Sequence, residues 1–220
     1  MEAESTPNGI GLVKLMGRNG GHIAVHASLG SRDVDCCLIP EVPFFLDGPG
    51  GLFEFVERRL KENGHCVLVV AEGAGQEFLE QANKTSAEKD LSGNMALHDI
   101  GLWLGKRLKD WWKTKHPKEL FALKYIDPTY MIRAVPSNAL DTEYCTLLAH
   151  SALHGAMAGY TGFVAGLLNE KFCYIPLEMV PNSQHVVDVT RHVWNWLKSV
   201  NNQPDFIVPI EEPLENNPTI

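Results

Sequence analysis

The chain has 220 residues and a formal net charge of −8 at pH 7. A net negative surface disfavours binding to nucleic acids and to anionic membranes, so a phosphate site would have to be a local basic pocket. No run approaches the roughly 18 to 20 apolar residues needed to cross a bilayer, and residues 1–5 have neither the basic nor the apolar part of a secretory signal. We therefore expect a soluble, cytoplasmic protein that contacts neither nucleic acid nor membrane.

The first predicted unit is a strand, a tight turn and a helix between Gly9 and Ala24. An apolar, β-prone run ends at residues 16–18, the chain crosses Gly20 and Gly21, and an apolar run with helical character follows at 22–29. Ligands bind at the carboxyl ends of strands in open α/β sheets, and the first N–H groups of a helix attract anions. Arg18 would lie at that point, although the spacing fits a glycine-rich turn with a solvated arginine equally well.

The rest of the chain alternates between strand and helix patterns. This alternation predicts an α/β fold with a mainly parallel sheet and flanking helices. Residues 1–203 would form this part, and residues 204–220 a loose polar tail. We expect strands at 36–39, 65–71 and 121–126, helices at 52–63, 95–116 and 141–160 with Asp141 as a cap, surface loops at 43–51 and 81–92, and a hairpin or two short strands at 163–168 and 172–175.

Four loops that follow strands carry polar side chains. They contain Met16-Gly17-Arg18, Glu41, Glu72, and the stretch from Ile126 to Arg133, which includes Tyr130. The carboxyl ends of parallel strands meet at one edge of a sheet, so these groups could converge there. Arginine matches phosphate oxygens bidentately and glutamate accepts hydrogen bonds from hydroxyls, which together suit a sugar phosphate. Alternatively, the glutamates cap backbone N–H groups, and the tyrosine and arginine are a packed ring and an ion-paired cation.

The histidines and cysteines predict no metal site. His150 and His154 share a helix face, but the run between them lacks the glutamate of the zinc-protease pattern, which favours helix packing. The five cysteines include no C-x-x-C pair, which favours reduced, buried thiols. Cys36 and Cys37 are adjacent in a predicted strand and should point to opposite faces. The sequence identifies no partner for Asp99 or His98.

Five ordered motifs carry a resemblance to a known family. They are G-I-G-L-V-K-L-M-G-R, R-D-V-D-C-C-L-I-P-E-V-P-F, G-G-L-F-E-F-V-E-R-R-L-K-E-N-G-H, A-E-G-A-G-Q and K-Y-I-D-P-T-Y-M-I-R. From about Glu2 to about Tyr174 the chain resembles the C-terminal half of the ATP-dependent 6-phosphofructokinases, in particular the plant-type group. The resemblance implies a phosphofructokinase-like fold, incomplete at the N-terminus, and transfer of the γ-phosphoryl group of MgATP to the 1-hydroxyl of fructose 6-phosphate in glycolysis.

The resemblance also implies roles for particular residues. Met16, Gly17 and Arg18 would contact fructose 6-phosphate, and Glu41 would bind its hydroxyls. The segment Tyr130, Met131, Ile132 and Arg133 would reach its phosphate end. Lys124 is a weaker candidate, at a position where bacterial members carry an arginine lent to a neighbouring subunit. Arg18 could also stabilise the transition state, because phosphoryl transfer depends on positioning and charge stabilisation.

Two motifs of the family do not occur in this chain. One is the Gly-Gly-Asp-Gly loop that holds the ATP phosphates and Mg²⁺, and the other is the Thr-Ile-Asp-Asn-Asp run that supplies the base. Residues 19–22, 91–94 and Ala134 also depart from the usual pattern. We therefore expect a truncated phosphofructokinase, inactive alone, that forms homo-oligomers or associates with complete subunits. Two functional alternatives remain: a non-catalytic sugar-phosphate-binding or regulatory partner, and a pyrophosphate-dependent relative. The alternative location is a plastid, if an upstream segment is missing.

Overall fold

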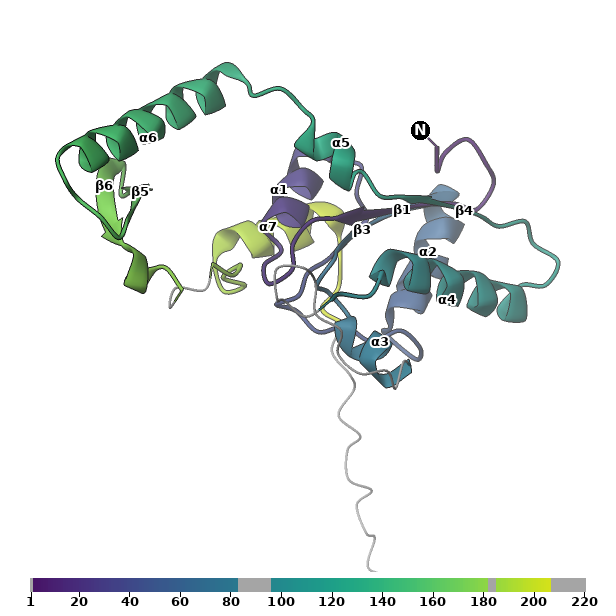
Figure 1. Ribbon diagram of the computed structural model, residues 1–220. Coiled ribbons are helices and arrows are strands. Elements are labelled where there is room, and N and C mark those ends of the chain that lie inside the picture. Colours follow the sequence, from purple (N-terminus) through teal and green to yellow (C-terminus); the bar gives the residue numbers. More distant parts are fainter. Residues whose placement is uncertain (1, 83–95, 182–184, 207–220) are drawn as a thin grey trace, which may run out of the picture. The chain divides into compact units, whose positions relative to one another are not determined.

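The computed structural model describes residues 2–82, 96–181 and 185–206. The chain divides into two compact units. The first contains the residues up to Thr129 and those from Val186 onward, and the second is Tyr130–His185. Because the positions of the two units relative to one another are not determined (Figure 1), each is described by itself.

A parallel sheet forms the centre of the first unit. Its strand order is β2-β3-β1-β4, and all three pairings are parallel, which confirms the predicted fold class. Leu12 in the central β1 stands opposite Leu68 on one side and Tyr125 on the other. The strands are β1 (Gly9–Leu15), β2 (Cys36–Leu38), β3 (His65–Ala71) and β4 (Ala122–Ile126).

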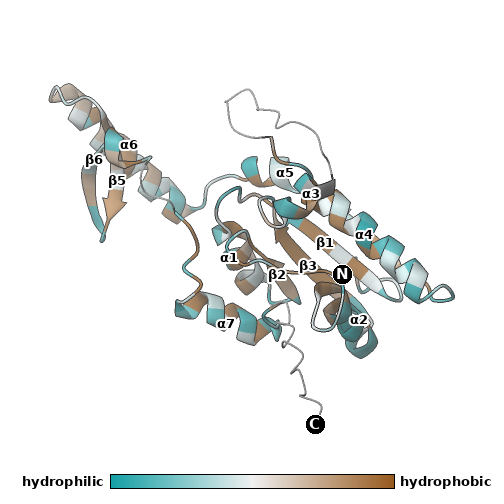
Figure 2. Ribbon diagram, turned by 90° about the horizontal axis from the view of Figure 1, so that it is seen from below, coloured by the Kyte–Doolittle hydropathy of each residue, from teal (hydrophilic) through white to brown (hydrophobic). Residues whose placement is uncertain are grey.

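Helices cover both faces of this sheet (Figures 1 and 2). On one face α2 (Leu52–Asn63) and α4 (Ile100–Lys115) bury Phe53 and Leu104 against strand residues. On the other face α1 (His22–Ser31) and α7 (His192–Asn201) pack through a second apolar cluster that includes Trp194. Cys36 belongs to the first cluster and Cys37 to the second, which confirms that these neighbours point to opposite faces.

A glutamine side chain pairs with the edge strand β2. The backbone N–H of Cys37 donates to Gln203 Oε1 at 2.7 Å, and Gln203 Nε2 donates to the Cys37 carbonyl at 3.0 Å. Gln203 is 8% exposed, so both backbone groups of Cys37 would otherwise be buried without partners. The side-chain amide therefore acts like one residue of a further strand and joins the segment after α7 to the sheet.

The second unit is a helix beside a two-stranded hairpin. It contains α6 (Ala139–Met157) and the antiparallel strands β5 (Phe163–Leu168) and β6 (Lys171–Pro176), followed by a 3-10 turn, η1 (Leu177–Met179). Gly155 is buried where α6 packs on the hairpin, and a Cβ there would lie 2.5 Å from the Phe163 ring. Many large apolar side chains of this unit, including Leu140 and Met157, are exposed, so its own core is small.

The hairpin is confirmed, but three helices were not predicted. These are α3 (Gln76–Ala82), α5 (Thr129–Arg133) and α7. Residues 81 and 82 end a helix instead of opening a surface loop, and the rest of the predicted 81–92 loop lies outside the described residues. Of the predicted tail, only residues 204–206 are described. None of the helices in the described part of the chain is long and apolar enough to span a membrane.

Two helix starts and one cysteine differ from the predictions. Helix α4 begins at Ile100, because Asp99 caps it by accepting a hydrogen bond from Leu102 N–H. Helix α6 is capped by Asn138, whose side chain accepts from Asp141 N–H at 2.8 Å, so Asp141 is a first-turn residue and not the cap. An aspartate is favourable both as the cap and in the first turn of a helix, so the sequence pattern did not show which of the two positions Asp141 occupies. Cys145 is exposed rather than buried.

Substitution of Gln203 tests its pairing with β2. Gln203→Met keeps the length of the side chain but leaves the buried N–H and C=O of Cys37 without their partners. We expect the free energy of unfolding to fall by about 1–3 kcal/mol in a urea titration. Trp196→Met is the matched control, because Trp196 is exposed and the change also introduces a methionine into this region, so stability should change little. Equal stability of the Gln203→Met protein and the wild type would contradict the assignment.

Candidate functional site

The loops after β1 and β3 are interlocked at the carboxyl edge of the sheet. The N–H of Glu72 donates to the Leu15 carbonyl at 2.9 Å, and the N–H of Gly73 donates to the Gly17 carbonyl at 3.0 Å. In return, Gly17 N–H donates to Glu72 Oε1 at 3.3 Å. The loop that carries Arg18 and the loop that carries Glu72 therefore form one surface.

Glycines permit this close approach. Gly17 has φ +149°, and a Cβ there would lie 2.6 Å from the Gly20 carbonyl oxygen. A Cβ on Gly73 would overlap the carbonyl oxygen of Arg18. Larger residues at either position would push the two loops apart, so the glycines fix the place from which the half-buried Arg18 extends.

Glu41 is held by backbone N–H groups. Both of its carboxylate oxygens accept from Gly21 N–H, at 3.0 and 3.1 Å, and Oε1 also accepts from Val187 N–H at 2.6 Å. The carboxylate thus lies at the amino end of α1, where the helix dipole favours a negative charge. This is where the sequence predicted an anion site, and the chain's own Glu41 already occupies it.

Glu72 is less committed to the backbone than Glu41. In the described part of the chain its carboxylate accepts the one long hydrogen bond from Gly17, and the residue is partly exposed beside the loop of Arg18. The position after a buried strand does not separate the two glutamates, but the resemblance assigns the sugar hydroxyls to Glu41. Glu72 has fewer described hydrogen bonds, and Glu41 keeps acceptor capacity beyond its two backbone donors, so the assignment to Glu41 stays a prediction.

A charged cluster around Lys14 lies next to this edge of the sheet. Its ammonium group is 3.2 Å from Asp99 Oδ2 and 2.9 Å from Asp127 Oδ2. The Tyr125 hydroxyl donates to Asp99 at 2.8 Å, so Lys14 and Tyr125 are the partners of Asp99 that the sequence did not identify. Asp127 in turn accepts from the N–H and hydroxyl of Thr129, the first residue of α5. Lys14 therefore links β1 to the starts of two helices.

The pKa values of this cluster follow from these contacts. Burial alone would lower the pKa of Lys14, but the hydrogen bonds with Asp127 and Asp99 raise it well above its ordinary value. Hydrogen bonds from Lys14 and Thr129 hold the pKa of Asp127 at about 2. Burial and the neighbouring Asp99 raise the pKa of Tyr125. Lys14 and both aspartates are thus charged, and Tyr125 is protonated, at neutral pH.

Four of the remaining sequence-predicted residues belong to the second unit. Tyr130, Met131, Ile132 and Arg133 lie in α5, and the first two are 83% and 69% exposed. Their meeting with the loops of the first unit therefore stays a prediction. Lys124 is exposed on β4, and its ammonium group lies 4.0 Å from Glu2 Oε2.

The described residues offer no assembled metal site. Within residues 2–82, 96–181 and 185–206, no three His, Cys, Asp or Glu side chains gather closely enough to hold an ion. Burial raises the pKa of the Cys37 thiol to about 12, so this cysteine stays protonated and is a poor metal ligand. His150 and His154 lie on the mostly exposed helix α6.

Comparison with known proteins agrees with this fold. The family model described as Phosphofructokinase matches residues 1–156. The chain is 64% identical over 206 residues to ATP-dependent 6-phosphofructokinase 2 of Arabidopsis thaliana, covering 94% of this chain and 46% of that protein. It is 43% identical over 209 residues to the ATP-dependent 6-phosphofructokinase of Borreliella burgdorferi, covering 92% of this chain and 46% of that protein. The chain thus spans about half the length of these relatives.

Solved structures resemble the fold at low sequence identity. A pyrophosphate-dependent phosphofructokinase from Marinobacter aquaeolei matches with a TM-score of 0.59 and 18% identity, over 86% of this chain and 44% of that chain. A phosphofructokinase from Pichia pastoris in the T-state matches with a TM-score of 0.53 and 19% identity, over 89% of this chain and 19% of that chain. At these identities the likeness concerns the fold alone.

The effect on stability of removing each glutamate's charge shows which carboxylate has the larger structural role. Glu41→Gln retains one acceptor where two oxygens now serve Gly21 and Val187, so we expect a loss of about 1–2 kcal/mol in the free energy of unfolding. Glu72→Gln should lose less than about 0.5 kcal/mol, because its one described hydrogen bond is long. Thermal and urea unfolding of the matched pair measures this difference. Equal losses would contradict the assignment of Glu41 as the more committed carboxylate.

The charged cluster predicts a pH dependence. The folded pKa of Asp127, about 2, lies below the ordinary value of about 3.9 expected on unfolding. Its contribution to stability is therefore complete above the unfolded pKa and is lost as the pH falls towards the folded pKa. Asp127→Asn keeps the acceptor for Thr129 but removes the charge. As the pH falls from about 5 to about 2, the melting temperature of the variant should decrease less than that of the wild type, and parallel curves would contradict the ion pair.

Proposed function

Because the chain belongs to the phosphofructokinase family, we propose that it supplies the fructose 6-phosphate side of an ATP-dependent 6-phosphofructokinase. The observation that carries this proposal is the interlocked edge formed by the loops of Arg18 and Glu72, in a chain 64% identical over 206 residues to a protein named for that activity. The whole enzyme would transfer a phosphoryl group from MgATP to the 1-hydroxyl of the sugar phosphate.

The loops of the first unit suit the sugar end of this substrate. Arg18 would contact the substrate through its guanidinium N–H groups, with Met16 and Gly17 beside it. Glu41 would accept hydrogen bonds from sugar hydroxyls, because its carboxylate has acceptor capacity beyond the N–H groups of Gly21 and Val187, and Glu72 is a second candidate for this role. Arg18 would also offset negative charge that develops on the transferred group.

The second unit would supply the phosphate end. Tyr130 offers a hydroxyl and Arg133 a planar fork of donors, which matches phosphate oxygens bidentately. Both side chains are exposed, so they are accessible to a ligand or to a neighbouring chain. Lys124 stays a weaker candidate for the same group.

MgATP would be held by residues outside this chain. The Gly-Gly-Asp-Gly loop that the resemblance assigns to the ATP phosphates and Mg²⁺ does not occur in this chain. The bound nucleotide would supply the phosphoryl group, and a complete subunit the base for the 1-hydroxyl. We accordingly propose association with complete subunits or with further copies of this chain. A cytoplasmic location is proposed, and a plastid is the alternative because two similar proteins are named chloroplastic.

We expect that the purified chain alone does not phosphorylate fructose 6-phosphate. The reaction needs a base, a metal against the phosphates and a cradle for the nucleotide, and losing one such group already costs several orders of magnitude. A coupled assay with MgATP and then with pyrophosphate, on protein free of host phosphofructokinase, measures turnover. Turnover that copurifies with the chain and disappears in Arg18→Ala would contradict the proposal. Sugar-phosphate binding by the chain that adds no turnover beyond that of the complete subunits by themselves would indicate a regulatory partner.

The phosphate end can be tested by binding. Arg133→Lys keeps the charge but loses the bidentate geometry, so fructose 6-phosphate should bind about 1–3 kcal/mol more weakly. Isothermal titration calorimetry compares the variant with the wild type, using the assembly with a complete subunit where the chain alone does not bind. Lys171→Arg, on the hairpin of the same unit, is the matched control and should leave the affinity unchanged. Equal affinities for all three proteins would remove Arg133 from the site.

A further inference from the structure

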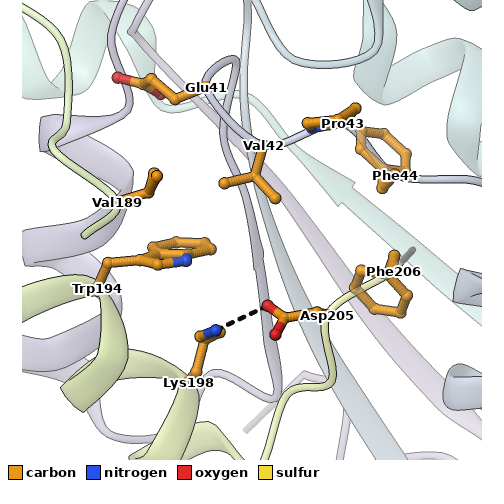
Figure 3. Close-up of a pocket in the computed structure, with 9 residues that line it drawn as sticks. All are labelled: Glu41, Val42, Pro43, Phe44, Val189, Trp194, Lys198, Asp205 and Phe206. Atoms are coloured by element: carbon orange, nitrogen blue, oxygen red, sulfur yellow. Dashed lines mark hydrogen bonds and ion pairs between the residues drawn. The ribbon is translucent and has the colours of Figure 1, made fainter.

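A pocket of about 430 Å³ lies between the loop after β2 and the segment that contains α7 (Figure 3). Its walls are mostly apolar and aromatic, and a hollow of this size suits a small molecule. The apolar walls are formed by Val42, Pro43, Phe44, Val189, Trp194 and Phe206. All of them belong to the first unit, so the pocket does not depend on how the two units are arranged.

A hydrogen-bond donor borders this pocket. Trp194 is 3% exposed as a residue and lines the hollow. Figure 3 shows the indole nitrogen on the side of the ring that faces the hollow. A ligand with a well-placed acceptor could therefore receive the indole N–H.

The charged side chains that line the pocket provide a hydrogen-bond acceptor and disfavour the binding of anions. Lys198 Nζ donates to Asp205 Oδ1 at 2.7 Å, which leaves Asp205 Oδ2 as an acceptor beside the aromatic walls. The carboxylate of Glu41 also borders the pocket, but Gly21 and Val187 already engage it. Two carboxylates and one ammonium group give the lining a net charge of −1. A phosphate or carboxylate ligand would therefore be repelled.

We propose that this pocket binds a small, uncharged aromatic compound that carries a hydrogen-bond acceptor and a donor on one edge. Its ring would pack against Phe44, Trp194 and Phe206, since aromatic faces prefer offset or edge contacts with other rings. Its acceptor would receive the indole N–H, and its donor would reach Asp205. Aromatic amides and neutral heterocycles have this combination. The pocket shares Glu41 with the predicted sugar site, but its lining includes neither Arg18 nor Arg133, so benzamide binding is measured separately from sugar-phosphate binding.

Benzamide is the probe, because it combines a ring, a carbonyl acceptor and an N–H donor without charge. Each of the five tryptophans gives one indole N–H signal in a ¹⁵N–¹H NMR spectrum of the full chain, and Trp194→Phe assigns the relevant signal. Benzamide should shift the Trp194 signal in a saturable way, with an affinity of roughly millimolar for so small a ligand. Benzoate carries a negative charge, and benzene has no hydrogen-bonding group. Each should bind at least about threefold more weakly than benzamide.

The variants separate the hydrogen bond from ring packing. Trp194→Phe keeps an aromatic ring but removes the donor, so benzamide affinity, followed by ligand-observed NMR, should fall about 3- to 10-fold. Trp196→Phe is the matched control, because Trp196 lies on the same helix, is 56% exposed and does not line the pocket, so its affinity should equal that of the wild type. If none of the five indole signals of the unaltered chain shifts in a saturable way, or if benzene binds that chain as tightly as benzamide, the proposal is overturned whether or not Trp194→Phe folds.

Discussion

The parallel pairing of β1 with β3 and β4 is the constraint on which the site depends. Hydrogen bonding in this register brings the carboxyl ends of the strands to one edge, so the loop of Arg18 lies against the loop of Glu72. Helices on both faces bury the strands and keep the sheet in one register. Glycines at the crossing, Gly17 and Gly73, allow the backbones to touch. Without that pairing, the polar residues after each strand would have no common surface.

Much of this arrangement could be predicted from the sequence, because it rests on local patterns. Continuous apolar runs such as 65–71 predict buried parallel strands, and polar residues directly after them predict an edge site. The helices α3 and α5 are short, with 7 and 5 residues, and carry little periodic signal. Helix α7 does bury Trp194 and Leu197 at helical spacing, a local pattern that our sequence prediction did not use, but its place against the sheet depends on long-range contacts such as the pairing of Gln203 with Cys37. The fold class was therefore predictable, and the packing of the C-terminal segment was not.

The roles of the two glutamates show why the site itself was harder to predict. Glu41 and Glu72 follow strands in the same manner, and the difference between them arises in part from Val187, 146 positions away from Glu41 along the chain. Likewise, Lys14 belongs to an apolar strand pattern, but Asp99 and Asp127 approach it from separate loops. Many large apolar side chains of the second unit, including Leu140 and Met157, are exposed, so the packing inside this unit does not account for its apolar pattern.

If the interlocked loops of the first unit receive the sugar phosphate, their backbone signals should respond to it. A ¹⁵N–¹H NMR titration of the chain with fructose 6-phosphate, repeated in the presence of an unlabelled complete subunit, measures this response directly. We expect saturable shifts of the backbone signals of Gly17, Arg18 and Gly73, with α2, which packs in the apolar cluster on one face of the sheet, unaffected. Saturable shifts confined to other parts of the chain, or sugar-phosphate binding in the assembly that leaves these three signals unchanged, would contradict this assignment.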